Sequence, residues 1–186
     1  MIFWIPLAII VIILLWLVFT YNGLISLRNR TKEAWSDIDV QLKRRYDLIP
    51  NLVKTVKAYA KHESSVFEKV TKARTEAMGA KGAKEQGKAE NMLTDALKSV
   101  FAVAENYPQL RASENFSKLQ DELTDTEDKI EAARRFYNGN VRDFNTKTQV
   151  FPTNMFAKNL GFDDFQLFGM EASQKEAAKE APKVDL

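Results

Sequence analysis

The residues best placed to do chemistry in this chain are charged side chains on the apolar faces of predicted helices. Glu63 falls at the centre of the apolar stripe of a helix predicted to begin near Pro50. A buried carboxylate needs a cationic partner or must be protonated. Its candidate partners and one competing acid are Arg45, Arg74, Arg134 and Glu127. These five residues form a candidate buried polar network, which is either a ligand, metal or proton site or a structural ion pair that fixes helix register.

His62 is the only histidine, and a single histidine on a helical bundle can act as a phosphoacceptor. It lies about 100° from the centre of the apolar stripe, so we expect an exposed side chain. The surrounding residues lack the His-x-x-Lys-Gly arrangement of phosphotransfer domains. An ordinary surface histidine is therefore favoured over a phosphorelay site.

Other arrangements that carry chemistry are missing from the sequence. There is no cysteine, which excludes disulfides, thiolate metal sites and cysteine nucleophiles. A carboxylate-bridged di-metal site needs Glu-x-x-His on two helices, and the chain has none. Phosphate-binding, dinucleotide-binding and Gly-x-Ser-x-Gly patterns are also absent. The sequence therefore predicts no enzyme, no metal and no cofactor.

The segment that must position everything else is the apolar N-terminus. No charged side chain precedes Arg28, and residues 2–19 are almost wholly aliphatic or aromatic. A helix of that length covers roughly 27 Å, close to the hydrocarbon thickness of a bilayer. A cleaved signal peptide would need a basic start and a small-x-small cleavage site, which this segment lacks. We therefore predict an uncleaved transmembrane anchor over residues 1–22 that contacts the lipid bilayer through residues 2–21.

Basic residues fix the predicted orientation of this anchor. They follow the apolar run, whereas only the terminal amine precedes it; they are Arg28, Arg30, Lys32, Lys43, Arg44 and Arg45. The positive-inside rule then predicts a single-pass protein of the cell (inner) membrane, with its N-terminus outside and its large domain in the cytoplasm.

The remaining chain reads as helical throughout. Apolar residues recur at spacings of three and four, and no stretch alternates as a strand does. The net charge of +2 comes from mixed signs and predicts no nucleic-acid partner. We predict an all-α fold in which the transmembrane helix is followed by an antiparallel four-helix bundle of long helices over residues 23–150.

Proline and glycine mark the expected ends of these helices. The first helix is expected to continue directly from the membrane span, and Asp47 with Pro50 is expected to restart the chain as a second helix. A flexible turn is expected at Gly79, Gly82 and Gly87. Pro108 is expected to end or kink the third helix. The apolar stripe of the fourth helix keeps its phase across Gly139, which predicts one unbroken helix there.

Residues 151–170 form an unusual Phe-rich segment. Its phenylalanines, which form a candidate interaction surface, are Phe151, Phe156, Phe162, Phe165 and Phe168. The segment is too interrupted for one long helix and too apolar for a solvated tail. Three interpretations stay open: it folds back on the bundle, docks a neighbouring subunit, or lies at the membrane interface. Residues 171–186 read as a disordered tail.

Several longer stretches resemble the LemA family of bacterial membrane proteins. Residues 34–45 read AWSDIDVQLKRR, residues 47–53 read DLIPNLV, and residues 133–138 read ARRFYN. The resemblance covers about residues 1–165. It implies an N-terminal anchor with a short external N-terminus, a cytoplasmic antiparallel helical bundle, and companionship with other membrane proteins such as a membrane protease. It carries over no catalytic residue.

These observations lead to two hypotheses for function. The first is a non-enzymatic, membrane-anchored scaffold or adaptor that binds protein partners and forms homo-oligomers. The alternative is a membrane-associated signalling component, either a ligand sensor that uses Glu63 with an arginine or a phosphorelay module that uses His62.

Overall fold

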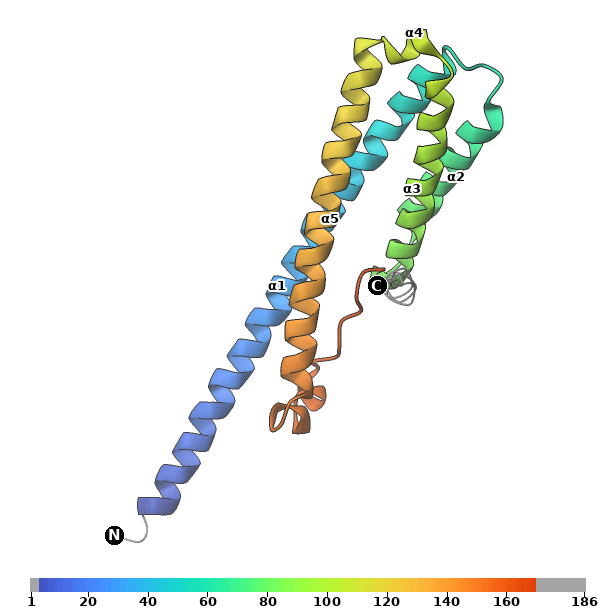
Figure 1. Ribbon diagram of the computed structural model, residues 1–186. Coiled ribbons are helices and arrows are strands. Elements are labelled where there is room, and N and C mark those ends of the chain that lie inside the picture. Colours follow the sequence, from blue (N-terminus) through green and yellow to red (C-terminus); the bar gives the residue numbers. More distant parts are fainter. Residues whose placement is uncertain (1–3, 170–186) are drawn as a thin grey trace, which may run out of the picture. The chain divides into compact units, whose positions relative to one another are not determined.

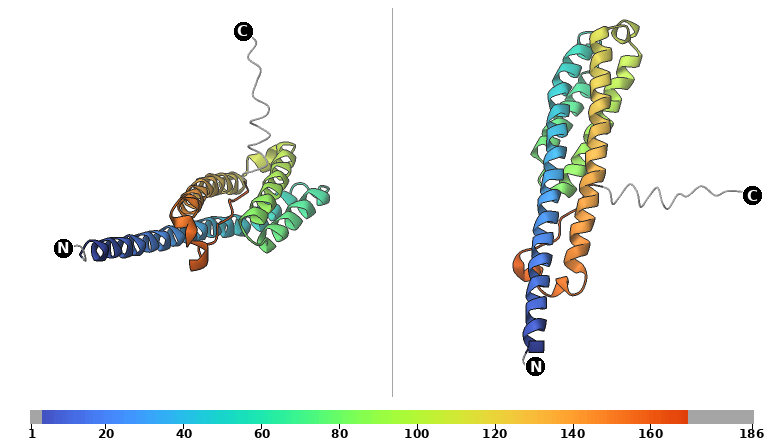
Figure 2. Two further views of the ribbon diagram at one scale, coloured as in Figure 1. Left: turned by 90° about the horizontal axis from the view of Figure 1, so that it is seen from below. Right: turned by 90° about the vertical axis from the view of Figure 1, so that its left-hand side faces the viewer.

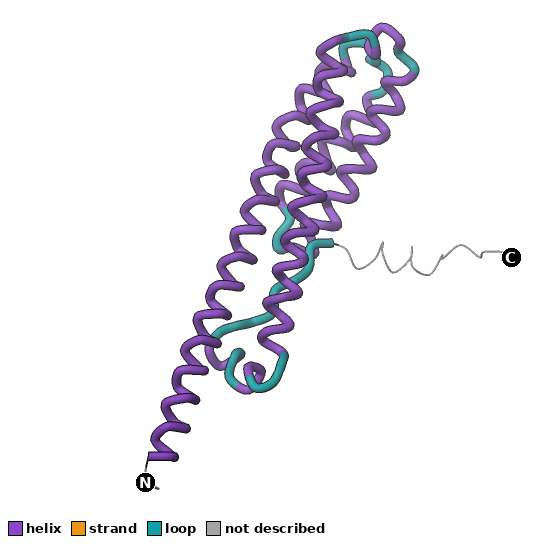
Figure 3. Tube along the Cα trace, turned by 60° about the vertical axis from the view of Figure 1, so that its left-hand side comes forward, coloured by secondary structure: helices purple, strands orange, loops and turns teal. Residues whose placement is uncertain are grey.

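The computed structural model describes residues 4–169, and every regular element among them is helical (Figure 3). The predicted all-α fold, with a long apolar N-terminal helix followed by helices that pack together, is confirmed. The predicted tail over residues 171–186 lies outside the described residues. The elements are α1 (Trp4–Lys57), α2 (Ser64–Gly79), α3 (Ala83–Glu105), α4 (Pro108–Arg111), α5 (Glu114–Gln149) and the 3-10 turns η1 (Thr153–Met155) and η2 (Lys158–Leu160), labelled in part in Figure 1.

α1 is a single helix that carries the apolar segment and continues beyond it without a break. It is the one helix of the described residues that is long and apolar enough to cross a membrane. Only 6% of its most apolar 18-residue window is buried inside the protein. The core helix of a soluble protein would be mostly buried, so the low value favours a lipid-facing span.

Two of the expected helix boundaries were wrong. α1 does not restart at Pro50 but continues to Lys57, and a short connection then leads to α2. Gly87 does not belong to a turn, because it lies inside α3. The turn itself is formed near Gly79, which ends α2, and Gly82, whose positive φ of 79° precedes α3. The expectation that α5 runs unbroken through Gly139 is confirmed.

The described residues belong to two compact units. Among the described residues, unit 1 contains residues 4–37 and Arg135–Phe165, and unit 2 contains Ile38–Arg134 and residues 166–169. α1 and α5 each contribute to both units.

In unit 1, the first part of α1 and the last part of α5 lie side by side (Figure 2). The chain that follows α5 packs against both of these helix segments. The core of this unit consists of Leu24, Phe144, Ala157 and Phe162, with Ile25, Leu27 and Phe165 packed against it. Asn145 holds the returning chain, because its side-chain amide donates to the Phe165 carbonyl at 2.9 Å and accepts from the Phe165 N–H at 3.0 Å.

In unit 2, α1, α2, α3 and α5 all contribute buried side chains at helical spacing. They include Ile38, Ile49, Leu52, Phe67, Leu93, Leu97, Phe116, Leu123 and Ile130. α2 and α3 form a hairpin in the same unit, and α4 completes the turn between α3 and α5. This core surrounds the polar cluster described below.

The Phe-rich segment divides between burial and exposure. Phe162 and Phe168 are buried, at 3% and 0% exposure, and Phe165 packs on the core of unit 1. Phe156 is half-buried, whereas Phe151 is 79% exposed. Folding back therefore accounts for the later part of the segment and leaves its beginning without a covering partner among the described residues.

Candidate functional site

Two neighbouring residues of α1 place polar groups in the core of unit 2. Arg45 and Tyr46 are 2% and 9% exposed. They lie between Leu42 and Ile49, the apolar residues that direct this face of α1 inward. A charged guanidinium at this depth requires an internal partner, because its hydration is lost.

The partners come chiefly from α3. Gln86, Glu90 and Thr94 are four residues apart, which aligns them on one face of that helix. Gln86 and Glu90 are buried, and Glu90 is only 2% exposed. This face is directed toward Arg45 and Tyr46.

The resulting cluster is densely hydrogen-bonded. Arg45 Nη1 lies 3.3 Å from Glu90 Oε2 and 3.0 Å from Glu127 Oε2 on α5, and Arg45 Nη2 donates to Thr94 Oγ1 at 2.7 Å. The Tyr46 hydroxyl donates to Glu90 Oε1. We call these residues, together with Gln86, the Arg45–Glu90 network.

Gln86 completes the network by serving several acceptors at once. Its side-chain amide lies 2.9 Å from Glu90 Oε1, 2.9 Å from the Tyr46 hydroxyl oxygen and 3.0 Å from the Ala77 carbonyl at the end of α2. The network thus joins side chains of α1, α3 and α5 and the backbone of α2. Such an arrangement suits fixing the relative positions of helices within the unit.

Burial raises the pKa of two groups of the network, the Glu90 carboxyl and the Tyr46 phenol. It raises the pKa of the Glu90 carboxyl, an effect that the Tyr46 hydrogen bond and the Arg45 charge oppose. Burial, followed by the hydrogen bond and charge of Glu90, raises the pKa of the Tyr46 phenol far above its usual value. Tyr46 is therefore a permanent hydrogen-bond donor and not a general base.

Arg74 has a different role, which explains why Pro50 does not end α1. Proline has no N–H, so the Tyr46 carbonyl four residues earlier loses its helical partner. Arg74 Nε on α2 donates to this carbonyl at 2.8 Å. A side chain from α2 thus replaces the hydrogen bond that Pro50 cannot make, and the helix continues to Lys57.

Because Arg74 replaces the hydrogen bond that Pro50 cannot make, the effects of mutating positions 74 and 50 on stability should be coupled. We expect Arg74→Met to lower the free energy of unfolding by about 1–3 kcal/mol, because the Tyr46 carbonyl is left unpaired. In a Pro50→Ala background the backbone gains an N–H at position 50 that can pair with this carbonyl, so the same change should cost clearly less. Urea denaturation of the four proteins measures both costs. Equal costs in the two backgrounds would contradict the assigned role of Arg74.

The raised pKa of Glu90 gives a pH prediction with a defined sign. Between the ordinary carboxyl pKa and the higher folded pKa, the folded state binds more protons than the unfolded state, so stability falls as pH rises. Glu90→Gln removes this titration. We expect the stability advantage of the parent protein over Glu90→Gln to be larger near pH 5 than near pH 7.5. Urea denaturation at each pH tests this, and the opposite trend would show that the pKa is lowered.

The residues of the candidate network predicted from sequence occupy four kinds of place. Arg45 and Glu127 are members of the Arg45–Glu90 network, and Arg74 binds the adjacent backbone. The Arg134 guanidinium lies over the Phe168 ring, 4.9 Å from its centroid, and burial lowers the pKa of Arg134. Glu63 is not at the centre of a buried stripe: it is half-buried and directly precedes α2, because α1 ends at Lys57. His62, in the same connection, is exposed.

Sequence reasoning missed Tyr46, Gln86 and Glu90. The signal lay in the spacing of Gln86 and Glu90, which continues the stripe of Leu93 and Leu97 toward the N-terminus. Assigning Gly87 to a turn removed those residues from the predicted helix. The central carboxylate was consequently sought on α2.

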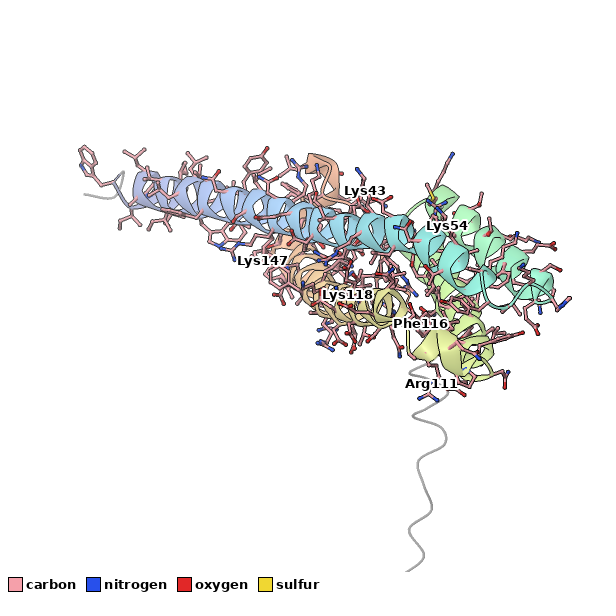
Figure 4. The ribbon with its side chains drawn as sticks, turned by 90° about the horizontal axis from the view of Figure 1, so that it is seen from above. Lys43, Lys54, Arg111, Phe116, Lys118 and Lys147 are labelled. Carbon is pink, nitrogen blue, oxygen red and sulfur yellow. The ribbon has the colours of Figure 1, made fainter. Side chains whose placement is uncertain are left out.

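Two grooves of this unit are lined by residues outside the network. One groove, of about 410 Å³, is lined by residues of α1 and α2 that include Val53, Phe67 and Thr71. The other, of about 280 Å³, lies beside Phe116 and Arg111, which Figure 4 labels. Among residues 4–169 no three His, Cys, Asp or Glu side chains cluster as metal ligands do.

Comparisons with known proteins place these features in a family. The chain is 26% identical over 194 aligned positions to magnetosome protein MamQ 2 of Paramagnetospirillum magneticum, covering 90% of this chain and 70% of the relative. It is 25% identical to magnetosome protein MamQ of Magnetospirillum gryphiswaldense, covering 82% of this chain and 65% of the relative. It is 27% identical to protein LemA of Metamycoplasma hominis, covering 83% of this chain and 70% of the relative. The LemA family model matches residues 34–186, and the chain belongs to the LemA family.

Proposed function

We propose that this protein is a non-enzymatic, membrane-anchored scaffold that binds protein partners and self-assembles at the membrane. The carrying observation is the continuity of α1, which runs from the exposed apolar span into residues of the packed helical units. The Arg45–Glu90 network supports the proposal, because its groups are paired with one another inside the protein. The relatives named magnetosome protein MamQ are consistent with work at a membrane-bounded structure.

Anchoring in the plane of a membrane favours self-assembly. Copies confined to one surface have a raised effective concentration, so contacts that are weak in solution can produce an oligomer. The basic residues after the span direct the helical units to the cytoplasmic side in this proposal. A partner such as a membrane protease would meet them there.

The anchor is tested with two charges in the span. We expect Ile9→Arg/Ile12→Arg to move the protein out of the membrane fraction, because each arginine at mid-bilayer costs several kcal/mol, about 2.5–3.5 on insertion scales. Both positions are exposed in the structure, so the helical units should keep their fold. Val40→Arg, which adds a charge at a 63% exposed site of unit 2, is the matched control. Equal membrane retention of both variants would refute the anchor.

The scaffold role is tested by the mass of the native complex. The membrane-extracted protein is weighed in mild detergent and in nanodiscs, and everything that co-purifies is identified. We expect an assembly several times heavier than the 21.3 kDa chain. A stoichiometric second membrane protein would identify an adaptor instead of a purely self-organising scaffold. A strict monomer that brings down nothing would refute both forms of the proposal.

A further inference from the structure

The beginning of the Phe-rich segment exposes a group of apolar side chains. Directly after α5, Val150, Phe151, Met155 and Leu160 are 44%, 79%, 70% and 48% exposed. We call residues 150–160 the apolar loop. Large apolar side chains gathered in so short a stretch indicate a surface that another apolar phase covers.

Contacts along α1 show where in unit 1 this loop lies. The Phe156 ring meets the Trp16 ring edge-on, with centroids 5.9 Å apart. Further along, Phe162 meets Tyr21 with centroids 5.6 Å apart, and the Arg28 guanidinium lies 5.3 Å from the centroid of the same Phe162 ring. The chain from Phe156 to Phe162 therefore follows α1 from the apolar span toward its first charged residue.

This register places the loop at membrane depth. Trp16 belongs to the apolar run, and it precedes Arg28 by twelve residues, or about 18 Å of helix. If residues 2–19 fill the hydrocarbon, Trp16 lies near the edge of that layer and Arg28 lies beyond the headgroups. Phe156, in contact with Trp16, cannot then be in bulk water.

We infer that the apolar loop inserts into the lipid leaflet from which the span emerges, as a second membrane contact of this chain. The bilayer is the covering phase, because Phe156 of the loop contacts Trp16, which belongs to the exposed apolar span of α1. Lys158, within the loop, supplies positive charge near the level of anionic headgroups, and Arg28 and Arg30 on α1 follow just beyond it. The inference rests on the anchor part of the proposed function.

The absence of cysteine makes a direct depth measurement possible. Single cysteines are introduced as Phe151→Cys and Met155→Cys, labelled with an environment-sensitive fluorophore, and the full chain is reconstituted in phosphatidylcholine–phosphatidylglycerol vesicles. Quenching by nitroxide-labelled phospholipids is compared with quenching by aqueous iodide. Phe136→Cys, at a 59% exposed position of α5 in the same unit, is the water-exposed control. Ile12→Cys, at a 65% exposed position of the span, reports the anchor itself.

We expect the labels at positions 151 and 155 to be quenched by the lipid nitroxide several-fold more than the label at position 136, and to be shielded from iodide. Lipid quenching at position 12 with iodide quenching at 151 and 155 would overturn the loop inference and leave the anchor intact. Shielding of 151 and 155 from both quenchers would also overturn it, because a protein neighbour would then cover the loop. Iodide quenching at position 12 would refute the anchor and the inference together.

Discussion

Replacing Arg45 with methionine is expected to lower the free energy of unfolding by about 3–5 kcal/mol at neutral pH, because the change leaves a buried acid without its cation. Glu90 is only 2% exposed and would keep its hydrogen bonds from Tyr46 and Gln86 but lose the Arg45 charge. The pKa of Glu90 should rise further, since Arg45 now holds it down. The destabilisation should therefore shrink in acid. Urea denaturation at pH 7.5 and pH 5 measures both effects.

The neighbouring arginine provides the matched control. Arg44 is 45% exposed and lies 3.7 Å from the exposed Asp125, so Arg44→Met should cost at most about 1 kcal/mol. In Arg45→Met/Glu90→Gln the buried charge at position 90 is gone and only the 41% exposed Glu127 loses its partner, so most of the lost stability should return. A cost for Arg45→Met no larger than that for Arg44→Met would show that Glu90 is not charged in the folded protein.

The second large effect is expected from one added methyl group at Gly87. An alanine Cβ there would lie 2.4 Å from Gly169 Cα and 2.7 Å from Gly169 N, which is closer than a folded backbone allows. The chain around Gly169 must therefore leave α3, and Phe168 must lose its burial. Burying a phenylalanine contributes about 1.5–3 kcal/mol, whereas alanine in a helix gains about 1 kcal/mol over glycine. We expect a net loss of about 0.5–2 kcal/mol in thermal or urea unfolding.

Gly139→Ala is the control for Gly87→Ala. An added Cβ at Gly139 meets no atom within 4 Å, so this change should raise stability by about 1 kcal/mol through helix propensity alone. Phe168→Ala should cost about 1 kcal/mol more than Gly87→Ala, because it brings no gain in helix propensity. The two changes combined should cost less than their sum, because both release the same contact. Stabilisation by Gly87→Ala would mean that Phe168 does not depend on this close approach.

The fold followed from the sequence because helical periodicity is a local signal. The apolar run, the continuity of α1 across Gly23 and the unbroken phase of α5 across Gly139 all depend on residues a few positions apart. The predicted restart at Pro50 failed because the hydrogen bond that compensates for proline comes from Arg74, on another helix. No local sequence pattern indicates that a residue of another helix will supply this hydrogen bond.

The candidate site was harder to predict for the same reason. Arg45 was identified from its place on an apolar face, but its buried partner depends on how α3 faces α1. Gly87 favoured a turn by composition, whereas the fold uses its missing side chain to let Gly169 approach. Glu63 was predicted to be buried because one helical periodicity was assumed to continue past Lys57. α1 ends at that residue, and Glu63 precedes α2.

The clamping of residues 156–162 along α1 has a mechanical consequence. Because Phe156 is held at Trp16 and Phe162 at Tyr21, any axial displacement of the span carries the loop with it. If the span and the apolar loop sit in the bilayer as proposed, the apolar run of about 27 Å is short for a thicker bilayer. Such a bilayer would thin locally or draw the helix inward, and the loop would then sink deeper into the leaflet. Under that proposal, the hydrophobic thickness of the bilayer would set the depth of unit 1 at the membrane surface, and the protein would favour thin or deformable regions of the membrane.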